Sequence, residues 1–93
     1  MSNTVRVRLP PVLRTAMGGQ DAIEGDGATI EEVLRTTSAA HPALGLHLFD
    51  ESGRPRRNIV CLHDGVLVRA TEFGRHAVKG GDELVLTNAL AGG

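Results

Sequence analysis

The segment from Thr29 to His41 constrains the fold most strongly, because it predicts a single amphipathic helix. Thr29-Ile30-Glu31-Glu32 matches a capping box. In this motif the Thr29 hydroxyl accepts a hydrogen bond from a free backbone amide, and the Glu32 side chain reaches back to the helix start. One side of the helix then carries apolar or small residues at helical spacing: Ile30, Val33, Leu34, Thr37 and Ala40. Pro42 ends the helix near His41. The single apolar face of this helix has to be buried against another layer of structure.

Two strands are expected before this helix. Residues Val5 to Leu9 alternate apolar and basic side chains, which is typical of a strand with one buried face. Pro10-Pro11 ends that strand, and residues 12–19 predict an irregular connection with a glycine turn at its end. A short second strand over residues 20–24 would return antiparallel to the first, and Gly25-Asp26-Gly27 would then form a turn.

The pattern after the helix predicts mostly strands. Residues 43–57 indicate a short helical turn followed by an exposed loop. Asp64-Gly65 separates two apolar runs, at 58–63 and 66–69, and is a two-residue hairpin signal. A last strand is expected from Glu83 onward.

This order of elements predicts an α+β roll. Two strands followed by one crossing helix and further strands predict a mixed sheet of four to five strands, with one main helix on one face. Ninety-three residues leave no room for a second core, so we expect one domain over residues 1–93. Residues 87–93 would then form a flexible C-terminal tail.

The composition argues against several classes of function. Phe49 and Phe73 are the only aromatic residues and the net charge is −1, whereas nucleic-acid binding calls for stacking aromatics and clustered positive charge. Cys61 is the only cysteine, and residues 1–6 lack the apolar core of a signal peptide. No apolar stretch approaches the roughly 20 residues that span a bilayer. We therefore expect a cytoplasmic protein that binds neither nucleic acid nor membrane.

The histidines and the glycine and arginine clusters are weaker candidates for a site. The histidines are His41, His47, His63 and His76. Their spacing does not match a zinc signature, so we expect no metal site and place them at the surface or its boundary. Cys61 lies in an expected strand and is interpreted as a buried, inert thiol. Gly80-Gly81 predicts a turn, since no phosphate-binding motif or helix follows it. Arg54-Pro55-Arg56-Arg57 predicts a solvated loop or, alternatively, a contact to an acidic partner.

Gly92-Gly93 is the candidate functional site. Glycine lacks a Cβ atom, so two in a row form a thin and pliable backbone that can be threaded into the active site of a partner. The α-carboxylate of Gly93 must be activated before it reacts, which indicates a carried substrate rather than a catalyst. Gly92 and Ala91 would provide the clearance. Seven residues span at most about 25 Å, which is enough to reach a buried site.

Several stretches of the chain together resemble a known family. They are the opening strand running into Leu9-Pro10-Pro11-Val12-Leu13-Arg14, then Gly27-Ala28-Thr29-Ile30-Glu31-Glu32-Val33-Leu34, Pro42-Ala43-Leu44, Asp64-Gly65, Lys79-Gly80-Gly81-Asp82-Glu83-Leu84 and Ala91-Gly92-Gly93. In this order they resemble the ubiquitin-like sulfur carriers of the ThiS/MoaD family, which have the β-grasp fold. Two positions depart from the pattern: many members have Asn-Gly in place of Asp64-Gly65, and a proline in place of Asn88.

The resemblance implies a mechanism and a set of partners. An adenylyltransferase related to ubiquitin-activating enzymes would use ATP and Mg²⁺ to adenylate the Gly93 carboxylate. A sulfur donor would then convert the acyl-adenylate to a thiocarboxylate, which a sulfur-accepting biosynthetic enzyme of cysteine, thiamine or thio-metabolite synthesis would use. The chain itself would supply no catalytic group and hold no permanent cofactor. Candidate docking residues for these partners are Val60, Leu62, Val66, Val68 and Leu90.

Three other functions remain open from the sequence. The chain could be the small subunit of molybdopterin synthase, with its tail inserted in a large subunit. It could be a protein modifier that forms isopeptide bonds from Gly93 to lysines. It could also be a β-grasp binding module whose tail has no role.

Overall fold

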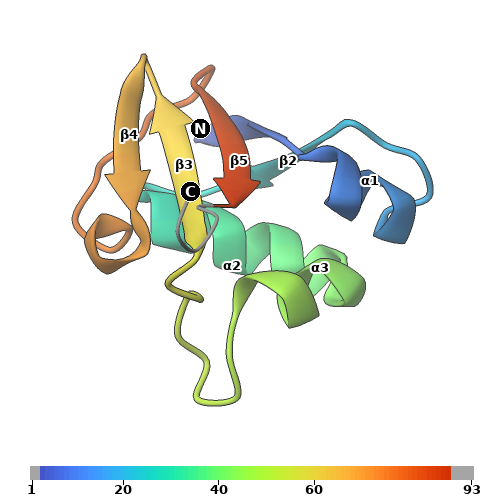
Figure 1. Cartoon of the computed structure of the whole chain (residues 1–93). Helices are drawn as coiled ribbons and strands as arrows, with labels where there is room; N and C mark the ends of the chain where they lie inside the picture. The colour runs from blue at the N-terminus through green and yellow to red at the C-terminus, as the bar shows by residue number, and fades with distance from the viewer. Residues whose placement is uncertain (1–2, 89–93) are drawn as a thin grey trace.

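The computed structural model describes residues 3–88. Its strands are β1 (Thr4–Arg8), β2 (Ala22–Asp26), β3 (Ile59–His63), β4 (Val66–Arg69) and β5 (Glu83–Asn88), and its helices are α1 (Pro11–Ala16), α2 (Ile30–Ala40), α3 (Pro42–Leu48) and the 3-10 helix η1 (Ala70–Glu72) (Figure 1). Because β5 continues to Asn88, Thr87 and Asn88 belong to the sheet, whereas we had expected them in the tail.

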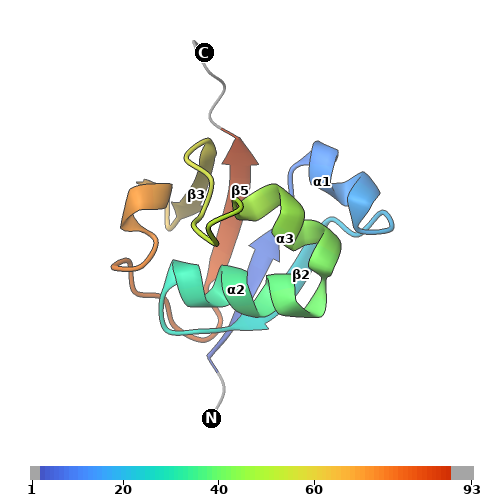
Figure 2. The ribbon, with the colours of Figure 1, turned by 90° about the horizontal axis from the view of Figure 1, so that it is seen from below.

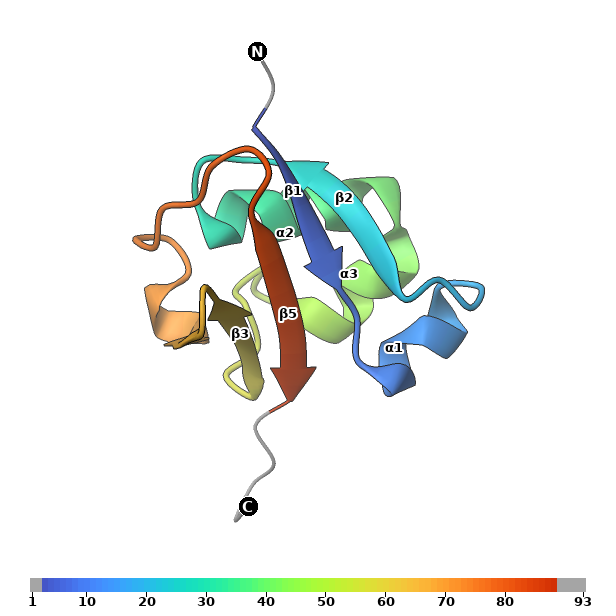
Figure 3. The ribbon, with the colours of Figure 1, turned by 90° about the horizontal axis from the view of Figure 1, so that it is seen from above.

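The five strands form one mixed sheet in the order β2-β1-β5-β3-β4. The first and last strands, β1 and β5, lie side by side in parallel at its centre, and all other neighbours are antiparallel. Helices α2 and α3 cover one face of this sheet (Figure 2), while within residues 3–88 no helix crosses the other face (Figure 3). The predicted mixed sheet and α+β class are confirmed.

Helix α2 begins with the predicted capping box. The Glu32 amide donates to Thr29 Oγ1 at 3.2 Å, and Glu32 Oε1 accepts from the Ala28 amide at 2.9 Å. The glutamate therefore satisfies the amide one residue before the cap rather than that of the cap itself. Four of the five residues predicted on the apolar face of α2 are buried, namely Ile30, Val33, Leu34 and Thr37. Ala40, the fifth, is exposed at the last turn of the helix.

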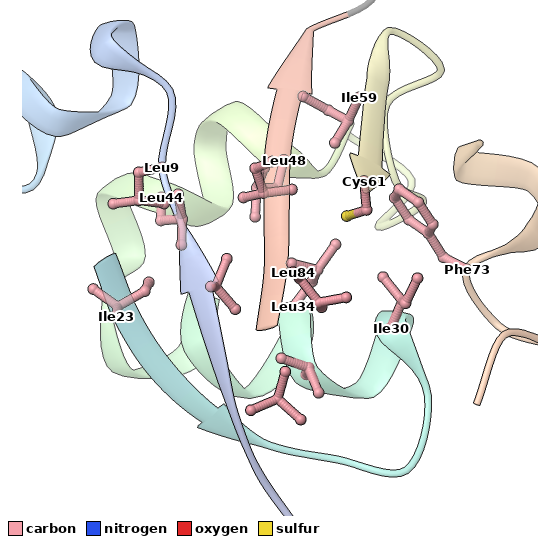
Figure 4. Packing of buried hydrophobic residues seen from close by; sticks show 14 of the residues in the cluster. Leu9, Ile23, Ile30, Leu34, Leu44, Leu48, Ile59, Cys61, Phe73 and Leu84 are labelled. Atoms are coloured by element: carbon pink, nitrogen blue, oxygen red, sulfur yellow. The ribbon is translucent and has the colours of Figure 1, made fainter. Parts of the chain in front are cut away.

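The core lies between the helices and the sheet and is almost entirely aliphatic (Figure 4). Leu84 and Leu86 of β5 are buried in it, and Leu84 lies opposite the buried Val7 of the neighbouring strand β1. Phe73 follows η1 and extends toward Cys61, closing the side of the core. Each such side chain contributes about 1.5–3 kcal/mol on burial, so the central strand β5 is held firmly from its core face.

Two local predictions before α2 are wrong. Residues 12–19 were expected to be irregular, yet α1 begins at Pro11, whose missing amide hydrogen costs nothing at the first helical position. The second strand runs over Ala22–Asp26 instead of 20–24, and it includes Gly25, which we had read as a turn residue. This strand position is a glycine because α2 packs very close to it: a Cβ atom at Gly25 would lie 2.4 Å from Thr37 Cγ2.

Pro42 has two structural roles. It ends α2 at Ala40, as predicted, and it also occupies the first turn of α3. The short helical turn expected after Ala43 is therefore a seven-residue helix, with Leu44 and Leu48 buried. Gly45 of this helix faces α2, where an added Cβ atom would lie 3.3 Å from Ser38 Cβ. The two helices therefore pack closely against each other at this point.

Candidate functional site

The candidate site starts where β5 ends. Ile59, at the start of β3, pairs with Asn88, the last residue of β5. Strand β5 pairs with β1 over residues 83–85 and with β3 over residues 84–88, so the pairing with β3 fixes the position of its end. The predicted site residues that follow, Leu90, Ala91, Gly92 and Gly93, lie outside the described residues.

The open face of the sheet carries an apolar patch made of Leu62, Leu67 and Val85, here called the outer apolar patch. Leu62 lies opposite Leu67 on one neighbouring strand and opposite Val85 on the other. Both leucines are exposed and Val85 is half-buried. An exposed apolar cluster of this kind on a polar sheet is typical of a contact surface.

Charged residues border this patch on the side of β1. Arg6 Nε and Arg8 Nη1 lie 3.9 and 3.8 Å from Glu83 Oε2, and all three side chains are about half exposed. Surface pairs of this kind contribute little to stability, typically about 0–1 kcal/mol. Their effect is on the surface itself, which changes from apolar over β3 and β4 to charged over β1.

The structure separates the predicted docking residues. Leu62 and Val66 are exposed, as a docking role requires. Val68 faces the core opposite Cys61, and Val60 is also buried, so neither offers an exposed side chain. Leu67 is also exposed, although it was not among the predicted docking residues. Counting alternately through the hairpin from a buried Cys61 would have placed Val68 inside and Leu67 outside.

His63 is buried, which corrects its expected place at the surface. Its Nε2 lies 2.8 Å from Asp82 Oδ2, and its Nδ1 lies 2.8 Å from His76 Nε2. A carboxylate only accepts, so Nε2 of His63 carries a hydrogen, and in the neutral ring Nδ1 then accepts from His76. The hydrogen bond from His63, followed by one from the Lys79 amide, lowers the pKa of Asp82 below its ordinary value of 3.8.

This network secures the turn that leads into β5. Gly81 has a φ of 90° and Asp82 donates its amide to the Lys79 carbonyl at 3.0 Å, which confirms the turn predicted at Gly80-Gly81. Asp64-Gly65 also forms the predicted hairpin turn, with φ values of 52° and 79°. The partly buried His63–Asp82 pair therefore fixes the start of β5, at the opposite end from Asn88.

Cys61 and the arginines of the loop before β3 have the burial that the sequence predicts. Cys61 is buried among apolar side chains, and its burial raises the pKa of the thiol to about 12. Arg54, Arg56 and Arg57 are exposed in the loop before β3. Within residues 3–88 no helix is long and apolar enough to cross a membrane.

A mixed five-stranded sheet with a central parallel pair and one main helix on one face defines the β-grasp, or ubiquitin-like, fold. The model of the ThiS family matches residues 7–93, so the chain belongs to the ThiS family. A comparison with curated protein sequences gave no match.

Solved structures agree with this assignment. SAMP1 from Haloferax volcanii is 28% identical with a TM-score of 0.80, and the match covers 97% of this chain and 99% of that one. A chain of the BexX/CysO complex from Amycolatopsis orientalis is 31% identical with a TM-score of 0.75, covering 96% and 99%. The small archaeal modifier protein 1 of Methanosarcina acetivorans is 26% identical with a TM-score of 0.79, covering 100% and 99%. The likeness thus extends over the whole β-grasp unit.

Proposed function

We propose that this protein is a sulfur carrier and that the C-terminal carboxylate of Gly93 carries the sulfur. The observation that carries this proposal is the match to the ThiS family, which runs through Gly93 itself. The fold supports it, because β5 is fixed on both sides and delivers the following residues from one defined point at Asn88. Gly92 and Ala91 provide a backbone with little side-chain bulk for a narrow channel.

The chemistry requires two steps on a partner enzyme. A carboxylate oxygen of Gly93 attacks the α-phosphorus of ATP, and pyrophosphate leaves. Sulfide then attacks the acyl carbon of the adenylate, AMP leaves with the bonding electrons, and a thiocarboxylate remains. The partner is an adenylyltransferase of the ubiquitin-activating class that holds ATP and Mg²⁺. A second enzyme takes the sulfur from the thiocarboxylate in a biosynthetic reaction.

The folded body acts as a scaffold in this proposal and takes no part in the chemistry. The His63–Asp82 pair is the one hydrogen-bonded acid–base pair that is partly buried in the described part of the chain. His63 pairs with Leu84, four residues before Asn88, which places it about 13 Å from the end of β5 at about 3.3 Å per residue. In this proposal the activation of the carboxylate comes from the partner.

We propose the outer apolar patch as the surface on the open face of the sheet to which a protein partner docks. Leu62 and Leu67 offer exposed apolar area next to the charged residues Arg8 and Glu83. A relative 31% identical to this chain is bound to another protein, BexX, in its crystal structure. We propose that this chain also acts in a complex with a protein partner.

Mass spectrometry of the intact protein tests the proposal. The 93-residue chain is incubated with the adenylyltransferase of its source organism, ATP, Mg²⁺ and sulfide, and we expect the mass to rise by one oxygen-to-sulfur exchange. Omitting ATP is the control, because oxidation of a methionine adds almost the same mass without it. A mass unchanged by ATP would refute the function.

Alkylation of the native protein adds a second, independent readout. A thiocarboxylate reacts with iodoacetamide, whereas Cys61 is buried and its thiol has a pKa of about 12. One ATP-dependent alkyl group is therefore expected on the folded protein, and peptide mapping should place it on Gly93. A chain lacking Gly93 should acquire none.

A protein-modifier function is the second candidate, and the likeness to small archaeal modifier proteins favours it. The activated Gly93 carboxylate would then be attacked by a lysine amine, with AMP leaving and an isopeptide bond forming. Expression of the tagged chain in its source organism tests this. Slow-migrating conjugates that contain Gly93 joined to lysine, and that vanish when Gly93 is deleted, would select the modifier.

A further inference from the structure

A groove lies between α1, α3 and the start of β3, outside the surfaces described so far. It has a volume of about 320 Å³. Its lining residues are Val12, Leu13, Leu46, His47, Arg56, Asn58 and Ile59. Leu13 and Ile59 form its buried apolar floor, whereas Val12 is 60% and Leu46 is 76% exposed. These two are the most exposed large apolar side chains in residues 3–88, and the core does not use them.

The groove lies beside the point where the chain leaves the sheet. Ile59 of its floor pairs directly with Asn88, the last residue of β5. Helix α1 lies near that end of the central strands (Figure 3). Five residues connect Asn88 to Gly93, and at about 3.3–3.6 Å each they span at most about 18 Å. An enzyme that holds Gly93 in its active site is therefore brought against this end of the folded body.

From this geometry we infer that the groove is a docking site for the adenylating enzyme and receives an apolar side chain from its surface. The inference rests on the proposed function, and it assigns a contact separate from the outer apolar patch. The short reach from Asn88 to Gly93 identifies the occupant, because any enzyme acting on the Gly93 carboxylate must approach within that distance. Burial of Leu46 and Val12 in the complex would supply the apolar contact.

The charge of the groove defines the partner further. Its lining includes Arg56 and His47 and no carboxylate. The Arg56 guanidinium donates from Nη2 to the Leu46 carbonyl at 3.2 Å, so it is held at the rim next to the exposed leucine. The complementary surface is an apolar side chain with a neighbouring aspartate or glutamate, which would approach Arg56 from the enzyme.

Binding and sulfur transfer are measured separately to test this site. The affinity of the chain for the adenylyltransferase of its source organism is determined by calorimetry for the wild type, Leu46→Glu and Val12→Glu. Each substitution is expected to weaken binding by about tenfold or more, since a carboxylate would replace an apolar contact at the centre of the site. Ala39→Glu is the control, because Ala39 is exposed on α2 and lines neither the groove nor the outer apolar patch, so this variant should bind normally.

The same measurement on chains lacking Gly92-Gly93 separates the inference from the proposed function. These chains cannot accept sulfur, yet the groove should still contribute to binding, and Leu46→Glu should weaken it further. If the wild type binds but its mass does not change with ATP, the sulfur-carrier function is refuted. The docking role of the groove is then decided only by the measured affinities. Wild-type affinity in folded Leu46→Glu and Val12→Glu, shown by circular dichroism, or no binding by the wild type, would overturn the site.

Discussion

Gly25 of β2 lies so close to Thr37 of α2 that a Cβ atom added at Gly25 would come within 2.4 Å of Thr37 Cγ2. Val33 adds its carbonyl oxygen at 3.2 Å from the same position. Gly25→Ala should therefore force the strand and the helix apart and lower the free energy of unfolding by about 1–3 kcal/mol. Urea denaturation at fixed pH measures the change.

A second substitution tests the cause of that loss. Thr37→Ser removes Cγ2 but keeps the hydroxyl that donates to the Leu34 carbonyl at 2.9 Å. Combined with Gly25→Ala it should restore part of the stability, which a double-mutant cycle would show as a favourable coupling. Gly74→Ala is the control, since its Cβ atom would meet only the flexible Glu31 carboxylate. Additive effects at Gly25 and Thr37 would contradict the steric explanation.

Removing the cap of α2 should cost less. Thr29→Ala leaves the Glu32 amide without its side-chain acceptor, and we expect a loss of about 1 kcal/mol in unfolding free energy. Thr29→Ser keeps the hydroxyl and should remain close to the wild type. Chemical denaturation followed by far-UV circular dichroism compares the two. Equal stability of the alanine and serine variants would show that the cap does not stabilise the helix.

Asp82 should make stability depend on acid pH. Because folding lowers the pKa of this carboxylate below 3.8, its contribution is present above that value and is lost as the pH falls through the lowered pKa. Asp82→Asn should therefore be less stable than the wild type near neutral pH, and the difference should shrink in strong acid. Urea midpoints of both proteins along a descending pH series measure it. A constant difference across the series would exclude the carboxylate as its cause.

Cys61 should be unreactive in the folded protein. With a pKa of about 12, only about one thiol in ten thousand is ionised four pH units lower, and burial blocks access as well. A chromogenic disulfide reagent at mildly alkaline pH should release no colour from the native chain and one equivalent in urea. Cys61→Ala should give none in either state. Rapid reaction of the native wild type would show that β3 opens.

The parts of the fold predicted well from sequence are those in which local chemistry and tertiary packing agree. The Thr29–Glu32 box, the spacing of α2 and the Asp64-Gly65 turn each carry their own structural signal, and all three are present. They differ from the prediction only in detail, because Glu32 accepts from the Ala28 amide and Ala40 is exposed. Gly25 shows the opposite case. Its turn preference is overridden because the packing of α2 on β2 admits no side chain, and that constraint arises from a residue twelve positions away.

The surfaces around the end of β5 could not be predicted from the sequence. Helix α1 has only six residues and one buried side chain, Leu13, too few to show a helical period in the sequence. The groove beside it forms only when α1 and α3 meet the start of β3. The burial of His63 likewise depends on Asp82 and His76, which the turn before β5 brings to it. Such contacts between distant segments leave no pattern in either segment alone.

The central place of β5 also has a mechanical consequence. Hydrogen bonds to β1 and β3 run along both of its sides, and those in the antiparallel ladder lie across the strand direction. Tension applied through the residues after Asn88 therefore loads many of these bonds at once, in shear, instead of peeling them away one at a time. In the proposed function, an enzyme that binds and releases this end of the chain would therefore pull against a strand held along its length.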